Sequence, residues 1–178
     1  GCVVGVSLAS TLKNRPRAAK MVFVVIDIIQ TVPTLAMLIF LMLVFGLNDA
    51  TVIAAIFLYS LFPITRNTYV GLTNVPGGVL RAGKGIGMTN LQLYLKVELP
   101  IALPVIFSGL RLAIISALGI ATTGVFIGAG GLGMLIWRGI QTRNTMMMLS
   151  GAIPVSAMAI LFEGLFTAIE RKLTNRAN

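Results

Sequence analysis

The sequence has no histidine, a single cysteine and only five acidic residues among its 178. It therefore cannot build a histidine-bearing triad, and it offers little for a general acid–base pair or a multidentate metal site. Cys2 has no second cysteine in the chain with which to form a disulfide, and we interpret it as a small apolar residue in a membrane. These shortages disfavour an enzyme and a metal centre.

Apolar residues, in contrast, are abundant. Hydrophobic residues make up 57% of the chain and charged residues 11%, and the mean hydropathy is +0.95. Such values are typical of an integral membrane protein. The net charge of +9 does not favour nucleic-acid binding, because the basic residues punctuate apolar runs and do not gather with aromatic residues on a solvated face. We expect a lipid bilayer around the chain and no nucleic-acid partner.

Five apolar segments approach the length of about 20 residues that a helix needs to cross a bilayer. They are residues 1–12, 21–47, 50–64, 101–125 and 145–169. The sequence thus predicts an all-α integral membrane protein with about five spans, in which residues 50–64 must extend toward Tyr69 or Leu72 to suffice. Because the chain opens inside an apolar run without Met, we expect it to be N-terminally truncated, with six spans in the intact protein.

The segment 21–47 is longer than one span requires and contains Asp27 and Pro33. We predict a break there, with residues 21–30 near the lipid headgroups. The spanning part then begins at Pro33, a residue tolerated in the first turn of a helix, and runs to Leu47. Asp27 is accordingly interfacial and not a buried proton or cation site.

Lysine and arginine are distributed unequally between the two sides of the predicted bundle. If the spans alternate in direction, Arg138 and Arg143 fall on one side and a much larger group on the other. That larger group is Lys13, Arg15, Arg17, Lys20, Arg66, Arg81, Lys84, Lys96, Arg171, Lys172 and Arg176. Because cytoplasmic loops carry an excess of basic residues, we place this group and the C-terminus in the cytoplasm, in a multi-pass protein of the cell membrane.

The longest predicted connection is a cytoplasmic loop at residues 66–100, and a loop of that length in a compact domain is usually functional. From Arg81 to Pro100 it reads RAGKGIGMTNLQLYLKVELP. This stretch resembles the EAA signature of ABC-importer permeases. In that signature, Glu-Ala-Ala is followed by three residues, Gly, nine residues, an aliphatic residue, one residue and Leu-Pro. The residues that match in register are Ala82, Gly87, Val97, Leu99 and Pro100.

Two positions depart from the signature, with Arg81 in place of Glu and Gly83 in place of the second Ala. Gly83 lowers the local helix propensity by about 1 kcal/mol relative to Ala. The resemblance implies that the loop forms a short coupling helix that docks into a groove of a cytoplasmic ATPase subunit. The residues implied in this coupling are Arg81, Ala82, Gly83, Lys84, Ile86, Gly87, Leu99 and Pro100.

The residues of the loop are themselves compatible with a docking helix. Apolar and small residues recur at spacings of three and four, with Arg81 and Lys84 off that face. The alternative is an interfacial helix that lies on lipid headgroups. Residues 78–85 have the spacing of a P-loop, but Gly85 replaces the hydroxyl residue that would hold magnesium, and no strand precedes it. We therefore expect no cofactor on this chain, and MgATP on a separate subunit.

Four further strings extend the resemblance over nearly the whole chain. They are IQTVPTLA at 29–36, FPITRNTY at 62–69, KVELPIALP at 96–104 and FIGAGGLG at 126–133. These strings look like the glycine betaine/carnitine/choline permeases of osmoprotectant ABC importers.

This wider resemblance implies a type I ABC importer permease fold in a single domain of residues 1–178. It also implies a homodimer or a pair with a paralogous permease, two ATPase subunits, and an external substrate-binding protein or a fused binding domain. One alternative is a permease of the same architecture that moves another solute, such as an amino acid or a sulfonate. A more distant one is a membrane channel that needs no ATPase.

Two charged residues fall inside predicted spans, where an ion is costly unless it is paired or hydrated. We interpret Arg111 and Glu163, which lie at similar depths, as an intramembrane ion pair or as part of the substrate path. The resemblance places the segment before the last span near the external gate, where Gly130 and Gly131 belong to a tight turn. Trp137 is there either a contact for the binding protein or an interfacial anchor.

Overall fold

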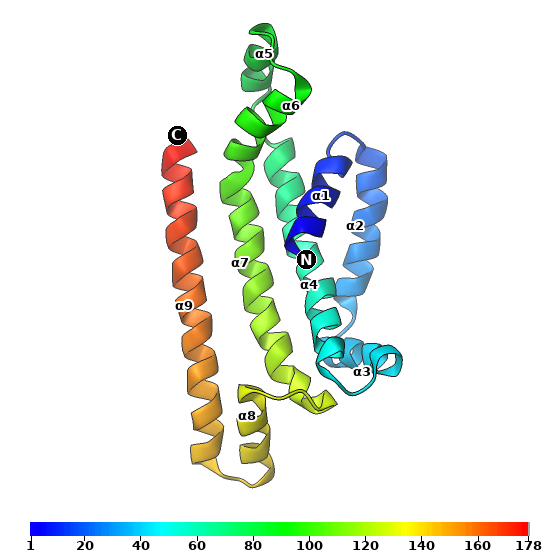
Figure 1. Ribbon diagram of the computed structural model, residues 1–178, viewed down its shortest axis with the longest axis vertical. Helices are drawn as coiled ribbons and strands as arrows, with labels where there is room; N and C mark the ends of the chain where they lie inside the picture. The colour runs from blue at the N-terminus through cyan, green and yellow to red at the C-terminus, as the bar shows by residue number, and fades with distance from the viewer. Residues whose placement is uncertain (178) are drawn as a thin grey trace.

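The computed structural model describes residues 1–177, and side chains as far as residue 173. Over this range the chain is helical, and its long helices lie side by side along one axis (Figure 1). The helices are α1 (Cys2–Leu12), α2 (Pro16–Thr31), α3 (Thr34–Phe45), α4 (Asp49–Thr73), α5 (Gly77–Gly85), α6 (Asn90–Leu93), α7 (Leu99–Thr123), α8 (Leu132–Gln141) and α9 (Thr145–Ala177). A π-helical turn, η1 (Tyr94–Glu98), precedes α7, and a 3-10 turn, η2 (Gly124–Ile127), follows it.

Within the described residues, three helices are long and apolar enough to cross a membrane unaided. They are α4, the continuous stretch Asn90–Ile127 that contains α7, and Thr145–Leu173 of α9. The pair α2 and α3 supplies a fourth if it is one broken span, whereas α1 is apolar but has only 11 residues. All five predicted apolar segments are therefore helical.

Helix α4 extends beyond residue 64, as a span requires, and ends at Thr73, one residue past Leu72. It continues because Thr68 and Leu72 are buried in the bundle. The connection to α7 consequently begins at Asn74 and not at residue 66, and Arg66 lies inside α4, which corrects its predicted place in the loop.

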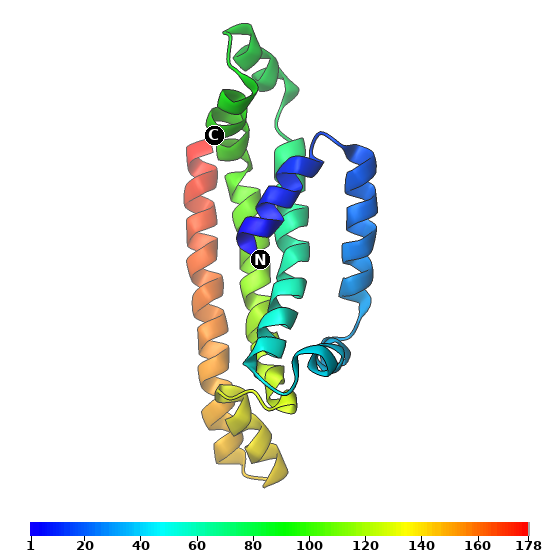
Figure 2. The ribbon, with the colours of Figure 1, turned by 45° about the vertical axis from the view of Figure 1, so that its right-hand side comes forward.

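The break predicted before Pro33 is present, but it is the part before the proline, and not the part after it, that runs along the bundle. Val32 is extended, as the residue before a proline prefers, and the axes of α2 and α3 differ by 98°. Helix α2 runs along the bundle beside α4, and α3 turns across its end (Figures 1 and 2). The prediction that the part after Pro33 runs along the bundle is therefore wrong. The reason is that polar contacts from Asp27 and Gln30 tie α2 to α4.

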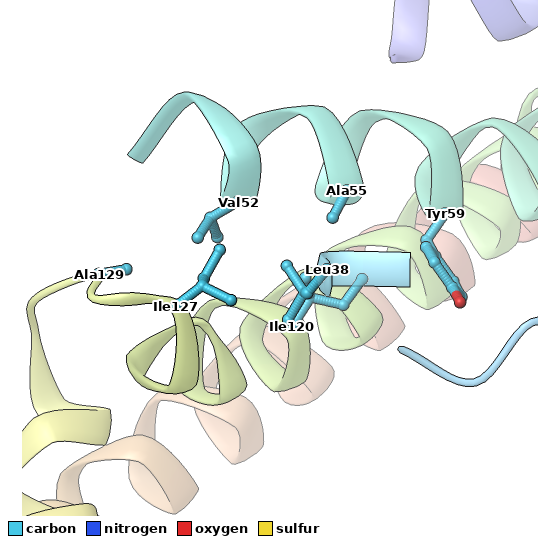
Figure 3. Close-up of a cluster of buried hydrophobic side chains, with 7 residues drawn as sticks. All are labelled: Leu38, Val52, Ala55, Tyr59, Ile120, Ile127 and Ala129. Atoms are coloured by element: carbon cyan, nitrogen blue, oxygen red, sulfur yellow. The ribbon is translucent and has the colours of Figure 1, made fainter. Parts of the chain in front are cut away.

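The core lies where α4 packs against α7, and small residues bring their backbones together. A Cβ on Gly109 of α7 would lie 2.6 Å from the carbonyl oxygen of Pro63, so only glycine permits this crossing. Gly5 gives α1 a similar approach to Ile64 of α4. At one end of the bundle an apolar cluster joins α3, α4 and the turn after α7 (Figure 3). Its buried members are Leu38, Val52, Ala55, Tyr59, Ile120, Ile127 and Ala129.

The two ends of the bundle carry different elements. The α1–α2 connection, helices α5 and α6 and the C-terminus lie toward one end, and α3 and the α8–α9 connection toward the other (Figure 1). This arrangement separates the basic residues of the first group of elements from Arg138 and Arg143, as the predicted alternation of spans requires.

Candidate coupling segment and charge cluster

The segment between α4 and α7 folds into a compact projection at one end of the bundle (Figure 2). It consists of α5, a turn, the short helix α6 and the π-helical turn η1. Of the residues implied in coupling, Arg81, Ala82, Gly83 and Lys84 lie in α5, Ile86 and Gly87 in the turn, and Leu99 and Pro100 at the start of α7. All of the first six except Gly83 are exposed.

Gly83 is buried because α5 packs against the end of α6 at this position. A Cβ there would lie 2.6 Å from Cδ1 of Leu93, which is itself buried. Gly83 thus brings the two short helices together inside the projection, while Arg81 and Lys84 remain on its surface. Ile86 is 77% exposed and Leu91 67% exposed, so the projection presents apolar side chains as well as basic ones.

The glycine of the signature makes the turn between α5 and α6. Gly87 has φ +83°, a conformation that costs other residues free energy, and its N–H donates to the Lys84 carbonyl at 3.0 Å. A capping box then starts α6: the Gln92 N–H donates to Thr89 Oγ1 at 3.2 Å, and the Thr89 N–H donates to Gln92 Oε1 at 2.9 Å. The turn is therefore specified by local sequence.

The Leu-Pro of the signature directly follows the π-helical turn and begins α7. The Leu99 N–H donates to the carbonyl of Tyr94, five residues back. Pro100 has no N–H, so the α-helical ladder cannot continue through Lys96, and the widened turn accommodates the gap. Helix α6, η1 and α7 thus form one continuous helical path with a local irregularity at the η1 junction.

A pair that the sequence pattern did not predict joins this junction to α1. Glu98 is 5% exposed, and its Oε2 accepts a hydrogen bond from Nζ of Lys13, the residue that caps α1. The hydroxyls of Tyr94 and Ser10 lie 2.7 Å apart and share a second hydrogen bond. The scarcity of acidic residues is the signal that could have revealed the pair, because a carboxylate in so apolar a chain needs a cation.

Between α7 and α9 the structure brings Arg111 and Glu163 together. Nη1 of Arg111 lies 3.4 Å from Glu163 Oε1, also 3.4 Å from Glu170 Oε2, and donates to Thr167 Oγ1 at 3.1 Å. Ser108 donates to Glu170 Oε1 at 2.5 Å. Glu170 was not predicted as a partner, although the spacing of residues 163, 167 and 170 places all three on one face of α9.

A second charged contact lies between α2 and α4. Arg66 Nη1 is 3.8 Å from Asp27 Oδ1, and its guanidinium lies 5.8 Å and 5.7 Å from the ring centroids of Phe23 and Phe62. Phe23 also meets Tyr69 edge to face, at 5.2 Å between centroids. Two aromatic rings and a carboxylate thus lie beside a half-exposed cation that belongs to the chain itself.

The glycine-rich stretch before α8 forms a tight turn with close helix packing. Gly131 has φ +99° and caps α8, and Gly130 lies beside it. Both line a pocket of about 150 Å³ with residues of α7 and α9. Trp137 of α8 is partly buried and meets Phe126 edge to face, with 4.8 Å between ring centroids. In the described part of the chain, no cluster of His, Cys, Asp or Glu could hold a metal ion.

This arrangement of helices, with its projection between α4 and α7, is that of the membrane permease component of an ABC importer. The chain belongs to the family of binding-protein-dependent transport system inner membrane components, which matches residues 1–175.

Two permeases are similar to this chain over most of its length. The carnitine transport permease protein OpuCD of Listeria monocytogenes is 46% identical over 172 residues, which cover 96% of this chain and 77% of that protein. The choline transport system permease protein OpuBD of Bacillus subtilis is 48% identical over 173 residues, covering 97% and 76%.

A solved structure agrees on the fold. A chain of the inward-facing MetNI methionine ABC transporter superposes with a TM-score of 0.83 over 97% of this chain and 87% of that chain. Its sequence identity is 23%. The predicted type I importer permease fold is therefore confirmed.

Proposed function

We propose that this permease imports small quaternary ammonium osmoprotectants such as glycine betaine, carnitine or choline. The observation that carries the proposal is the similarity, along nearly the whole chain, to permeases named for carnitine and choline transport.

The coupling projection docks, in this proposal, on a separate cytoplasmic ATPase that binds and hydrolyses MgATP. Exposed apolar residues such as Ile86 and Leu91 support it, because such side chains at the tip of a membrane protein call for a covering partner. Arg81 and Lys84 add positive charge to the docking surface and favour an acidic groove on the ATPase. Closure of the ATPase dimer then moves the projection, and the motion passes into α7.

The orientation follows from the same docking. The projection and the C-terminus share one end of the bundle, which becomes the cytoplasmic end, in agreement with its basic residues. The opposite end, with Gly130, Gly131 and Trp137, then forms the external gate and meets the binding protein or fused binding domain. A second permease chain, identical or paralogous, completes the pathway.

Substrate selectivity belongs mainly to the binding protein. Aromatic rings hold quaternary ammonium groups through their faces, but Phe23 and Phe62 already hold the guanidinium of Arg66. Arg111 is likewise engaged by Glu163 and Thr167. In this proposal the Arg111 cluster holds α7 to α9 and does not itself select the solute.

Uptake of labelled glycine betaine tests the proposal. A transport-deficient host would express this permease with its ATPase and binding protein, and choline, carnitine and unrelated amino acids would compete. We expect ATP-dependent uptake that the quaternary amines suppress and the amino acids do not. Suppression by amino acids or sulfonates alone would indicate a permease for another solute, and uptake without ATP would indicate a channel.

A further inference from the structure

The strongest polar connection between α1 and the coupling projection is the ion pair of Lys13 with Glu98. Its side chains are only 18% and 6% exposed, so the charges meet largely out of water. The neighbouring hydrogen bond between Ser10 and Tyr94 joins the same two elements, and Lys13 Nζ lies 6.0 Å from the Tyr94 ring centroid. These contacts bind the last turn of α1 to η1.

Helix α1 is in turn packed closely on α4. A Cβ on Gly5 would lie 2.7 Å from Cγ2 of Ile64, and Ala9 is fully buried. Lys13 therefore follows directly on a helix whose body is packed against α4.

The rest of the projection stands apart from α1. A cavity of about 570 Å³ lies between them, with Lys13 and Asn14 of the α1 end on one side and Leu80 and Lys84 of α5 on the other. Glu98 and Tyr94 also line it. Ser10 and Lys13 at the α1 end thus meet the projection at η1.

We propose that the Lys13–Glu98 pair transmits the movement of the coupling projection to α1, so that α1 and α7 respond together. Glu98 is then a positioning residue for coupling. Its backbone continues directly into α7, and its carboxylate is paired with Lys13 at the end of α1. This inference rests on the proposed coupling of the projection to an ATPase, but it does not depend on which solute is carried.

Transport stoichiometry provides the first test. The complete transporter, with its ATPase and binding protein, is reconstituted in liposomes with wild-type permease, Glu98→Gln, or the exchange Lys13→Glu with Glu98→Lys. Lys20→Met is the matched control, since it removes a lysine charge from an exposed position of α2. We expect Glu98→Gln to lower the solute imported per ATP hydrolysed by about fivefold, as loss of a coupling contact does, and the exchange to restore most of it. An unchanged ratio in Glu98→Gln would overturn the proposal.

Spin-label distances provide the second test and need no transported solute. On a Cys2→Ser background, labels replace the exposed residues Thr11 of α1 and Leu95 of η1. With the pair intact, we expect the same narrow distance distribution without nucleotide and with ATP held by a hydrolysis-deficient ATPase. In Glu98→Gln the distance should change with nucleotide. A distance that changes equally with the pair intact would overturn the inference, even if Glu98→Gln reached the membrane too poorly for uptake assays.

The two tests separate the two ideas. If no quaternary amine is imported but the wild-type distance stays constant while that of Glu98→Gln changes, the proposed substrate fails and the link between α1 and η1 stands. If quaternary amines are imported with wild-type stoichiometry by Glu98→Gln, the link fails and the proposed function stands.

Discussion

Gln30 of α2 donates its side-chain N–H to the backbone carbonyl of Tyr59 in α4, at 3.0 Å. That carbonyl lacks the usual helical donor four positions on, because residue 63 is a proline and has no N–H. The Tyr59 hydroxyl returns a hydrogen bond to the Val32 carbonyl at the break between α2 and α3. The carbonyl freed by Pro63 in α4 is thus paired with a side chain of α2, and the carbonyl at the break after α2 is paired with a side chain of α4.

Replacement of Gln30 by an apolar residue removes the donor to the Tyr59 carbonyl and should therefore lower the stability of the fold. We expect Gln30→Leu to lower the free energy of unfolding by about 1–3 kcal/mol, the usual penalty for a buried group without a partner. Thermal unfolding of the purified permease in detergent measures the change. In a Pro63→Ala background, where residue 63 regains an N–H, the same substitution should cost clearly less, and equal costs would contradict the assigned role of Pro63.

The turn of the coupling projection should depend on Gly87 and not on Gly85. A Cβ added at either position would meet no atom within 4 Å, but only Gly87 has a positive φ, of +83°. We expect Gly87→Ala to strain the turn by about 1–2 kcal/mol and to weaken binding of the ATPase subunit to the purified permease accordingly. Gly85→Ala, at the end of α5, is the control and should bind as the wild type does. Equal affinities for the two variants would contradict the importance of the turn.

The charge cluster between α7 and α9 should respond unequally to loss of its members. Arg111→Met leaves two carboxylates without their shared cation, whereas Glu163→Gln removes one half-exposed partner and leaves Arg111 with Glu170 and Thr167. We expect a loss of about 1–3 kcal/mol in unfolding free energy for Arg111→Met and less than about 1 kcal/mol for Glu163→Gln. Thermal unfolding, with the exposed Arg138→Met as control, distinguishes them. A larger effect from Glu163→Gln would mean that Arg111 is not the centre of the cluster.

The approach of α8 to α7 should not tolerate a methyl group. A Cβ on Gly133 would lie 2.3 Å from the backbone oxygen of Thr122, which cannot move aside as a side chain does. We expect Gly133→Ala to cost about 1–3 kcal/mol of stability and to impair uptake through the displaced turn at Gly131. Gly164→Ala in α9 meets no atom within 4 Å and should be neutral or slightly stabilising. Comparable stability of the two variants would contradict the close packing.

The sequence could predict the helical class and the apolar segments, because hydropathy is a local property. It also predicted the break at Pro33, whose cause lies in the proline ring. It could not predict which side of the break runs along the bundle, since that depends on Asp27 and Gln30 meeting partners in α4.

The same limit applies to the polar contacts of the site. Lys13 and Glu98 are 85 positions apart in sequence, so nothing local connects them. Arg111 could be matched with Glu163 because a charge inside an apolar span is costly unless an opposite charge pairs with it. The same reasoning did not identify Glu170, because it directly precedes Arg171 and Lys172 at the basic end of α9, where a charged residue is expected.

The stretch Asn90–Ile127 is continuous over 38 residues, from the coupling projection to the turn before α8. At a rise of about 1.5 Å per residue it is roughly 57 Å long. A rod of that length, tilted by about 10° around one end, displaces its other end by roughly 10 Å. In the proposed mechanism, a modest rotation at the projection is thus amplified into a displacement of this size at the far end of the stretch.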